Sequence, residues 1–158
     1  MIIRKFSQIF MLFLAGVMLA GCSKGGSCVD TGGMDELDAS KAIARKLSDL
    51  SKSVKDEASY RSAIPTMKAC YGDLKGELVD LKARVEKMAA SKKGQSEMSP
   101  QDMEEAMKIF GGMMEFVGIM AELEQETNRI HSAIPNYEAI ETETGLKASM
   151  EEVEKALN

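Results

Sequence analysis

Methionine is the residue of this chain whose chemistry and spacing first suggest a function. The chain has 13 methionines, and six of them fall within 23 residues: Met98, Met103, Met107, Met113, Met114 and Met120. Soft thioether ligands select Cu(I), and methionine with histidine can hold haem. The candidate ligands for such a small-ligand binder are Met103, Met107, Met113 and His131. Methionine also fills irregular cores and adaptable contact surfaces, so binding of Cu(I), haem or an apolar ligand stays an alternative.

Residues for covalent or acid–base catalysis do not form a recognisable set. His131 is the only histidine, and the sequence contains no G-x-S-x-G, H-E-x-x-H or phosphate-loop motif. Carboxylate pairs such as Glu122 and Glu126 have the i, i+4 spacing of a solvated helix face. We therefore predict that the protein is not an enzyme and that no metal is part of its normal site.

Composition favours a single helical domain. The 158 residues include 44% hydrophobic and 28% charged residues but only three prolines, and the net charge is −5. This acidic balance removes the basic footprint of a nucleic-acid binder. The acidity is concentrated in residues 99–158, which carry 13 acidic and 4 basic groups, a net charge of −9.

The first 22 residues have the pattern of an export signal. Arg4 and Lys5 precede an apolar run from Ile9 to Leu19, which is too short for a normal membrane span. The segment ends in Leu19-Ala20-Gly21-Cys22. This ending resembles the lipobox of bacterial lipoproteins, although the resemblance covers only these residues and indicates no fold family for the rest of the chain.

The lipoprotein resemblance implies how the chain is processed and where it resides. Residues 1–21 would be cleaved, and Cys22 would carry a diacylglycerol and an N-acyl chain, the only groups attached to the protein. Two or more acyl chains anchor a protein stably to a bilayer. Because Ser23 rather than Asp follows the cysteine, the resemblance implies sorting to the outer membrane, facing the periplasm.

The two remaining cysteines lie in a compartment that permits disulfides. Cys28 and Cys70 are therefore a possible intramolecular pair; two free thiols or an intermolecular bridge are the alternatives. A helix that began at residue 35 and turned back near Pro65 would hold the two cysteines too far apart. An intramolecular bond then requires the helix to begin later, near Asp38 or Ser40.

The rest of the chain predicts an all-α domain over residues 35–158, after a Gly/Ser-rich flexible tether over 22–34. Apolar residues recur at helical spacing over about 35–60, from Pro65 to Lys93, over 99–132 and from Pro135 to the end. The second pattern alternates spacings of 4 and 3 from Met67 to Met88, Ser99-Pro100 is a start signal for the third, and weak helix formers at 141–145 indicate that the fourth frays or bends there. Folding back at both prolines gives an antiparallel four-helix bundle of two hairpins. The repeated Ser-Ala-Ile-Pro at 62–65 and 132–135 fits two related hairpins. The alternative is a hairpin of two long, proline-kinked helices.

These features together predict a lipid-anchored periplasmic protein that acts through protein–protein contacts in the cell envelope. An adaptor, an assembly accessory and an immunity or exclusion lipoprotein all fit. The expected partners are the bilayer, through the acyl chains, and an envelope protein; nucleic acid is not expected. The apolar, glycine-containing segment Ile109–Leu123 is the best candidate for the contact. Its predicted partner-binding residues are Met113, Met114, Val117 and Met120.

Overall fold

The computed structural model describes residues 28–91 and 99–157, which form five helices and no strand. The predicted all-helical class is confirmed. Within this described part, no helix is both long enough and apolar enough to cross a bilayer. The helices are α2 (Glu36–Ser53), α3 (Glu57–Ser91), α4 (Pro100–Ala133), α5 (Tyr137–Thr144) and α6 (Leu146–Leu157).

The first turn lies at residues 54–56 rather than at Pro65, so the predicted boundary was wrong. Val54 has extended backbone angles and ends α2. Asp56 then caps α3: its Oδ1 accepts from the Ser59 backbone N–H at 2.8 Å, and Ser59 Oγ accepts from the Asp56 N–H at 3.0 Å. This reciprocal cap satisfies two amides that a new helix leaves unpaired, and it starts α3 eight residues before the proline.

Pro65 is instead inside α3, where it is exposed to solvent. An interior proline removes one helical hydrogen bond. On an exposed face, water can satisfy the carbonyl that loses its partner. The second Ser-Ala-Ile-Pro has a different setting, because α4 ends at Ala133 and Pro135 lies in the following turn. The repeated tetrapeptide therefore does not mark two equivalent hairpins.

The C-terminal segment forms two short helices where the sequence predicted one that frays or bends at 141–145. Gly145 ends α5 in the left-handed region, with φ of 74°, and its N–H donates to the Thr142 carbonyl. A glycine adopts this backbone conformation without strain from a Cβ atom. The resulting bend directs α6 back along α3.

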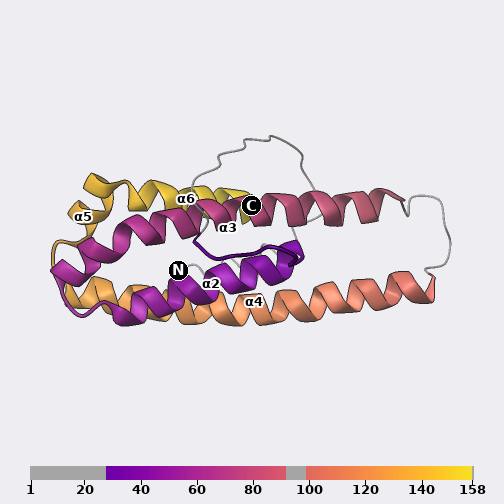
Figure 1. The fold of residues 1–158 in the computed structure, drawn as a ribbon, viewed down its shortest axis with the longest axis horizontal. Helices are drawn as coiled ribbons and strands as arrows, with labels where there is room; N and C mark the ends of the chain where they lie inside the picture. Colours follow the sequence, from indigo (N-terminus) through magenta and orange to yellow (C-terminus); the bar gives the residue numbers. More distant parts are fainter. Residues whose placement is uncertain (1–27, 92–98, 158) are drawn as a thin grey trace.

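Helix α2 is the central packing element of the fold, since it contacts both α3 and α4, while α6 packs against α3. Figure 1 shows that α3 and α4 both extend well beyond the start of α2. Ion pairs join α2 to α4 at successive levels: Lys41 and Arg45 contact Glu115, and Lys52 contacts Glu122. These pairings advance together along both helices, so α2 and α4 run in the same direction.

One apolar core connects the helices. Twenty-two buried apolar residues from α2 to α6 form a single cluster. Helices α2, α3, α4 and α6 each contribute a stripe at helical spacing, as an amphipathic helix on a shared core should, and α5 contributes Ile140. The largest fully buried side chains in this core are Phe116, Ile43, Leu47, Leu74, Ile140 and Leu146.

A disulfide joins Cys28 to Cys70 of α3, with a Cα–Cα distance of 5.1 Å. The Cys28 N–H also donates to Asp73 Oδ2 at 2.7 Å, and Gly32 N–H donates to Asp30 Oδ1 at 3.0 Å. Cys28 is thus held against α3, and local hydrogen bonds fold the residues that follow it, from Asp30 to Met34. The prediction that all of 22–34 is a flexible tether was wrong for this part.

The pairing forms even though α2 begins at Glu36 and is capped by Asp35, whose Oδ1 accepts from the Asp38 N–H at 2.9 Å. The expectation that such an early helix start would hold the two cysteines too far apart assumed that the chain turned back at Pro65. With the turn at 54–56, Cys70 lies about 15 residues beyond it, roughly level with the first turn of α2. The short segment from Cys28 to Asp35 can span that distance easily.

Candidate functional site

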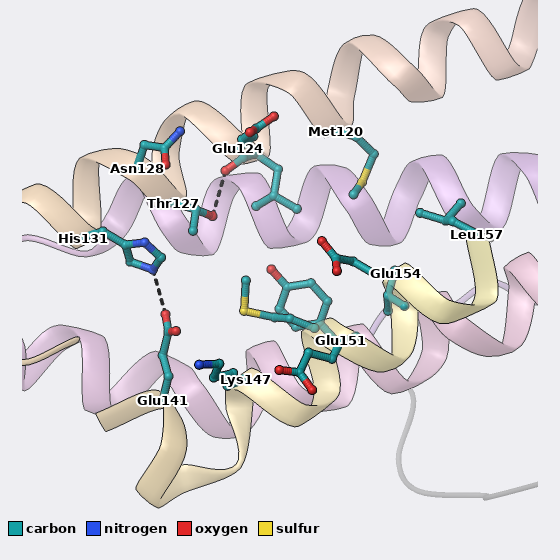
Figure 2. A pocket seen from close by; sticks show the side chains of 14 residues that line it. Met120, Glu124, Thr127, Asn128, His131, Glu141, Lys147, Glu151, Glu154 and Leu157 are labelled. Carbon is teal, nitrogen blue, oxygen red and sulfur yellow. Dashed lines mark hydrogen bonds and ion pairs between the residues drawn. The ribbon is translucent and has the colours of Figure 1, made fainter. Parts of the chain in front are cut away.

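A groove between α4 and α6 is a concave site in the part of the chain that the structure describes. It has a volume of about 370 Å³, with α3 behind it. Figure 2 shows side chains from α4 on one wall and from α6 on the other, pointing into the space between them. The two walls do not pack closely on each other. Its lining residues are Tyr71, Met120, Leu123, Glu124, Thr127, Asn128, His131, Glu141, Lys147, Met150, Glu151, Val153, Glu154 and Leu157.

The groove has an apolar base and an acidic border. Leu123, Val153 and Leu157 are buried core residues that face it, and Met120 and Met150 are partly buried beside them. Four carboxylates and one lysine also line it, which gives a net charge of −3 with His131 neutral. Such a site suits a ligand that has an apolar surface and carries positive charge.

A buried polar cluster closes the groove at the α5 end. Glu141 Oε1 accepts a hydrogen bond from the Tyr60 hydroxyl at 2.6 Å and lies 2.8 Å from His131 Nε2. The His131 ring stacks on Tyr137, with centroids 3.7 Å apart and planes 11° apart. These contacts join α3, α4 and α5 at one point, so they fix the width of the closed end. Figure 2 shows the His131–Glu141 contact.

The electrostatics of this cluster fit a structural role. Burial disfavours the charged form of Glu141, but hydrogen bonds from His131 and Tyr60 outweigh it and hold the pKa of Glu141 below its ordinary value. Burial and the neighbouring Glu141 carboxylate raise the pKa of the Tyr60 phenol. Tyr60 therefore stays protonated and donates a hydrogen bond. The cluster holds a buried carboxylate in place rather than activating a nucleophile.

A second surface feature lies on a different face of α4, nearer its N-terminus, where four large apolar side chains are exposed. They form a stripe at spacings of 4, 3 and 4 residues, which places them on one helical face. Glu105, which pairs with Arg84 of α3 at 2.9 Å, lies on the opposite face of α4. We call this feature the α4 stripe; its residues are Met103, Met107, Phe110 and Met114, with exposed fractions of 50, 64, 53 and 56%.

The four predicted partner-binding residues do not share one environment. Met114 belongs to the exposed α4 stripe. Met113 and Val117 are half-buried, and Met120 lines the groove. The predicted set therefore spans two different surfaces of α4. The sequence signal for the stripe was the spacing of residues 103, 107, 110 and 114. Met103 and Met107 were instead interpreted as metal ligands, and Met114 as a partner contact.

The candidate metal or haem ligands are dispersed along α4, so the ligand set proposed from sequence was wrong. Met103 and Met107 point to solvent on the α4 stripe, while His131 pairs with Glu141 at the closed end of the groove. Met107 and His131 are separated by roughly 36 Å along the helix axis. Within residues 28–91 and 99–157, no three His, Cys, Asp or Glu side chains cluster as a metal site would require.

The groove itself was not predicted. It depends on α6 packing on α3 and not on α4, which no local pattern encodes. One signal was present: α6 alternates apolar Met150, Val153 and Leu157 with acidic residues. Cys22 and the other predicted signal residues lie outside the described part of the chain.

Comparison with known proteins adds no relationship. No protein-family model matches the chain, and no curated protein or solved structure matches it significantly.

Proposed function

We propose that this chain is a lipid-anchored lipoprotein of the bacterial envelope that acts without catalysis, by binding a partner protein along the α4 stripe. The helical domain would face the periplasm from the outer membrane, held by acyl chains on Cys22. The lipobox-like ending at residues 19–22 supports the anchor. The Cys28–Cys70 disulfide supports an oxidising compartment.

The observation that carries the proposal is the exposure of the α4 stripe. Large apolar side chains scattered singly are normal on a surface, but a contiguous group is typical of an interaction site. The side chain of each stripe residue is at least half exposed. Burying them would contribute hydrophobic free energy that the chain alone does not gain.

A helix of another protein fits the α4 stripe best. The spacing of 4, 3 and 4 residues is that of a coiled-coil seam, which takes a helical partner. A second copy of this chain is a poorer partner, because residues 100–133 carry seven acidic and two basic groups. Pairing two such helices would bring like charges together. The partner helix should therefore be apolar on one face and neutral or basic beside it.

Photo-crosslinking in living cells tests this proposal. A photoreactive amino acid at position 107 or 114 should crosslink the same protein, whereas the same amino acid at Lys87, an exposed position of α3, should not. Met107→Lys in combination with the probe at 114 should reduce the crosslink at least fivefold. Crosslinking only to a second copy of the chain, or equally from position 87, would contradict the proposal.

A further inference from the structure

We infer that the groove between α4 and α6 is a docking site for an amphipathic, positively charged helix of a partner protein. This inference goes beyond the proposed function, since it concerns a different face of α4 and does not depend on the α4 stripe.

The arrangement of the helices leaves one side of the domain open. Helix α2 contacts α3 and α4, and α3 contacts α6, but α4 and α6 are separated along their length by the groove. In a closed bundle these two helices would pack together and bury their facing residues. Here Met120 of α4 and Met150 of α6 both line the groove instead. A further helix laid between the walls would cover this apolar base.

The dimensions fit a helix better than a compact ligand. The lining residues run from Met120 to His131 on α4 and from Lys147 to Leu157 on α6, so the walls are each about 15 Å long. Three turns of helix present apolar anchors over the same length. The volume of about 370 Å³ accommodates a few such side chains, while the backbone of the docked helix stays outside. His131 and Glu141 block the α5 end, which fixes how far that helix can slide.

The charge of the groove specifies the flanks of the docked helix. Glu124 stands on the α4 wall, and Glu151 and Glu154 stand on the α6 wall. Lys147 is the only lysine or arginine among the lining residues. Lysine or arginine beside the apolar face would meet carboxylates on both sides, whereas an acidic helix would be repelled. The methionines suit such a site, because flexible thioether side chains adapt to different apolar anchors.

Methionine-methyl NMR on the full chain in zwitterionic nanodiscs tests the inference. The probe is an 18-residue amphipathic peptide of leucine and lysine, and its leucine–glutamate counterpart is the comparison. In the Met107→Lys background, which disables the α4 stripe, the leucine–lysine peptide should shift the methyl signals of Met120 and Met150 saturably and leave that of Met103 unchanged. The leucine–glutamate peptide should bind at least tenfold more weakly.

Charge variants make the test specific. Glu151→Lys should weaken binding of the leucine–lysine peptide by about three- to tenfold, and Lys147→Glu should strengthen it by a similar factor. Glu104→Lys is the matched control, because Glu104 is exposed on α4 outside the groove, and it should change binding less than twofold.

Four results would overturn the inference: no saturable shift at Met120 and Met150, equal binding of both peptides, equal effects of Glu151→Lys and Glu104→Lys, or stronger binding of dodecyltrimethylammonium than of the peptide. The last result would assign the groove to a small cationic amphiphile. Failure here leaves crosslinking from position 107 unaffected, and Met107→Lys should not alter the peptide-induced shifts of Met120 and Met150, so the two proposals fail separately.

Discussion

Two glycines of α4 provide a direct test of how closely α2 approaches α4. A Cβ atom added at Gly112 would lie 2.5 Å from Leu37 Cδ2 and 3.2 Å from Leu37 Cγ. A Cβ atom added at Gly118 would meet nothing within 4 Å. Both glycines lie inside the same helix, so Gly112→Ala and Gly118→Ala make the same chemical change in different surroundings.

The expected stabilities of these variants differ in sign. Replacing a mid-helix glycine by alanine gains roughly 0.5–1 kcal/mol, because glycine loses more backbone entropy on folding. Gly118→Ala should show this gain. Gly112→Ala receives the same gain but forces Leu37, a core residue, out of its position, which costs about 1–3 kcal/mol. The net expectation for Gly112→Ala is a loss of up to about 2 kcal/mol.

Urea and thermal unfolding followed by circular dichroism measure both variants. The two should differ by about 1–3 kcal/mol in unfolding free energy, which corresponds to roughly 3–5 °C in Tm for each kcal/mol. If Gly112→Ala is as stabilising as Gly118→Ala, then α2 does not contact α4 at Leu37. The packing described for these two helices would then be wrong.

Three further perturbations should give defined results. Glu141→Gln should lower the unfolding free energy by about 1–2 kcal/mol at pH 7, because it weakens a buried hydrogen-bonded carboxylate. Since the folded pKa of Glu141 is lowered, the stability that it contributes is present above about pH 4.5 and is lost as the pH falls through the folded pKa. In urea titrations from pH 7 to 3, the unfolding free energies of wild type and Glu141→Gln should therefore converge. A difference that stays constant with pH would contradict this. Ser48→Ala should stabilise the fold by about 1 kcal/mol in the same assay, because the buried Ser48 hydroxyl has no hydrogen-bond partner; a loss would indicate a partner for it. Replacing Cys28 and Cys70 together by serine should cost about 4 kcal/mol, from the loop that the disulfide closes, and an unchanged Tm would show that the bond does not constrain the unfolded chain.

The helical class could be predicted because it depends on local pattern. The 4–3 spacing from Met67 to Met88 lies wholly within α3, and Ser99-Pro100 marks the start of α4 within one residue. Gly145 ends α5 where weak helix formers had indicated a bend. Each of these features is decided by residues adjacent in sequence.

The first turn was misplaced because two local signals competed. Proline is a strong helix breaker, but its cost is limited on an exposed face, and Pro65 is exposed. The Asp56–Ser59 cap actually starts the helix. Which signal prevails depends on burial, which is a tertiary property. The same error placed Cys28 and Cys70 too far apart for a bond, since the turn sets the level of Cys70 beside α2.

The groove and the α4 stripe were missed for a different reason. Whether a methionine of α4 is buried, faces the groove or is exposed depends on which neighbours cover it. Helix α2 is only 18 residues long, so it leaves the N-terminal part of α4 uncovered, where Met103 and Met107 lie (Figure 1). Periodicity identifies the apolar faces of a helix but not the length of the helix that packs on them.

Native mass spectrometry of the full chain, gently extracted from the membranes of the cells that produce it, tests both the lipid anchor and the partner. It should detect a chain that begins at Cys22, carries acyl chains there, and retains one protein partner that Met107→Lys removes. An uncleaved or unacylated chain would contradict the anchor. A partner retained equally by wild type and Met107→Lys would contradict binding along the α4 stripe.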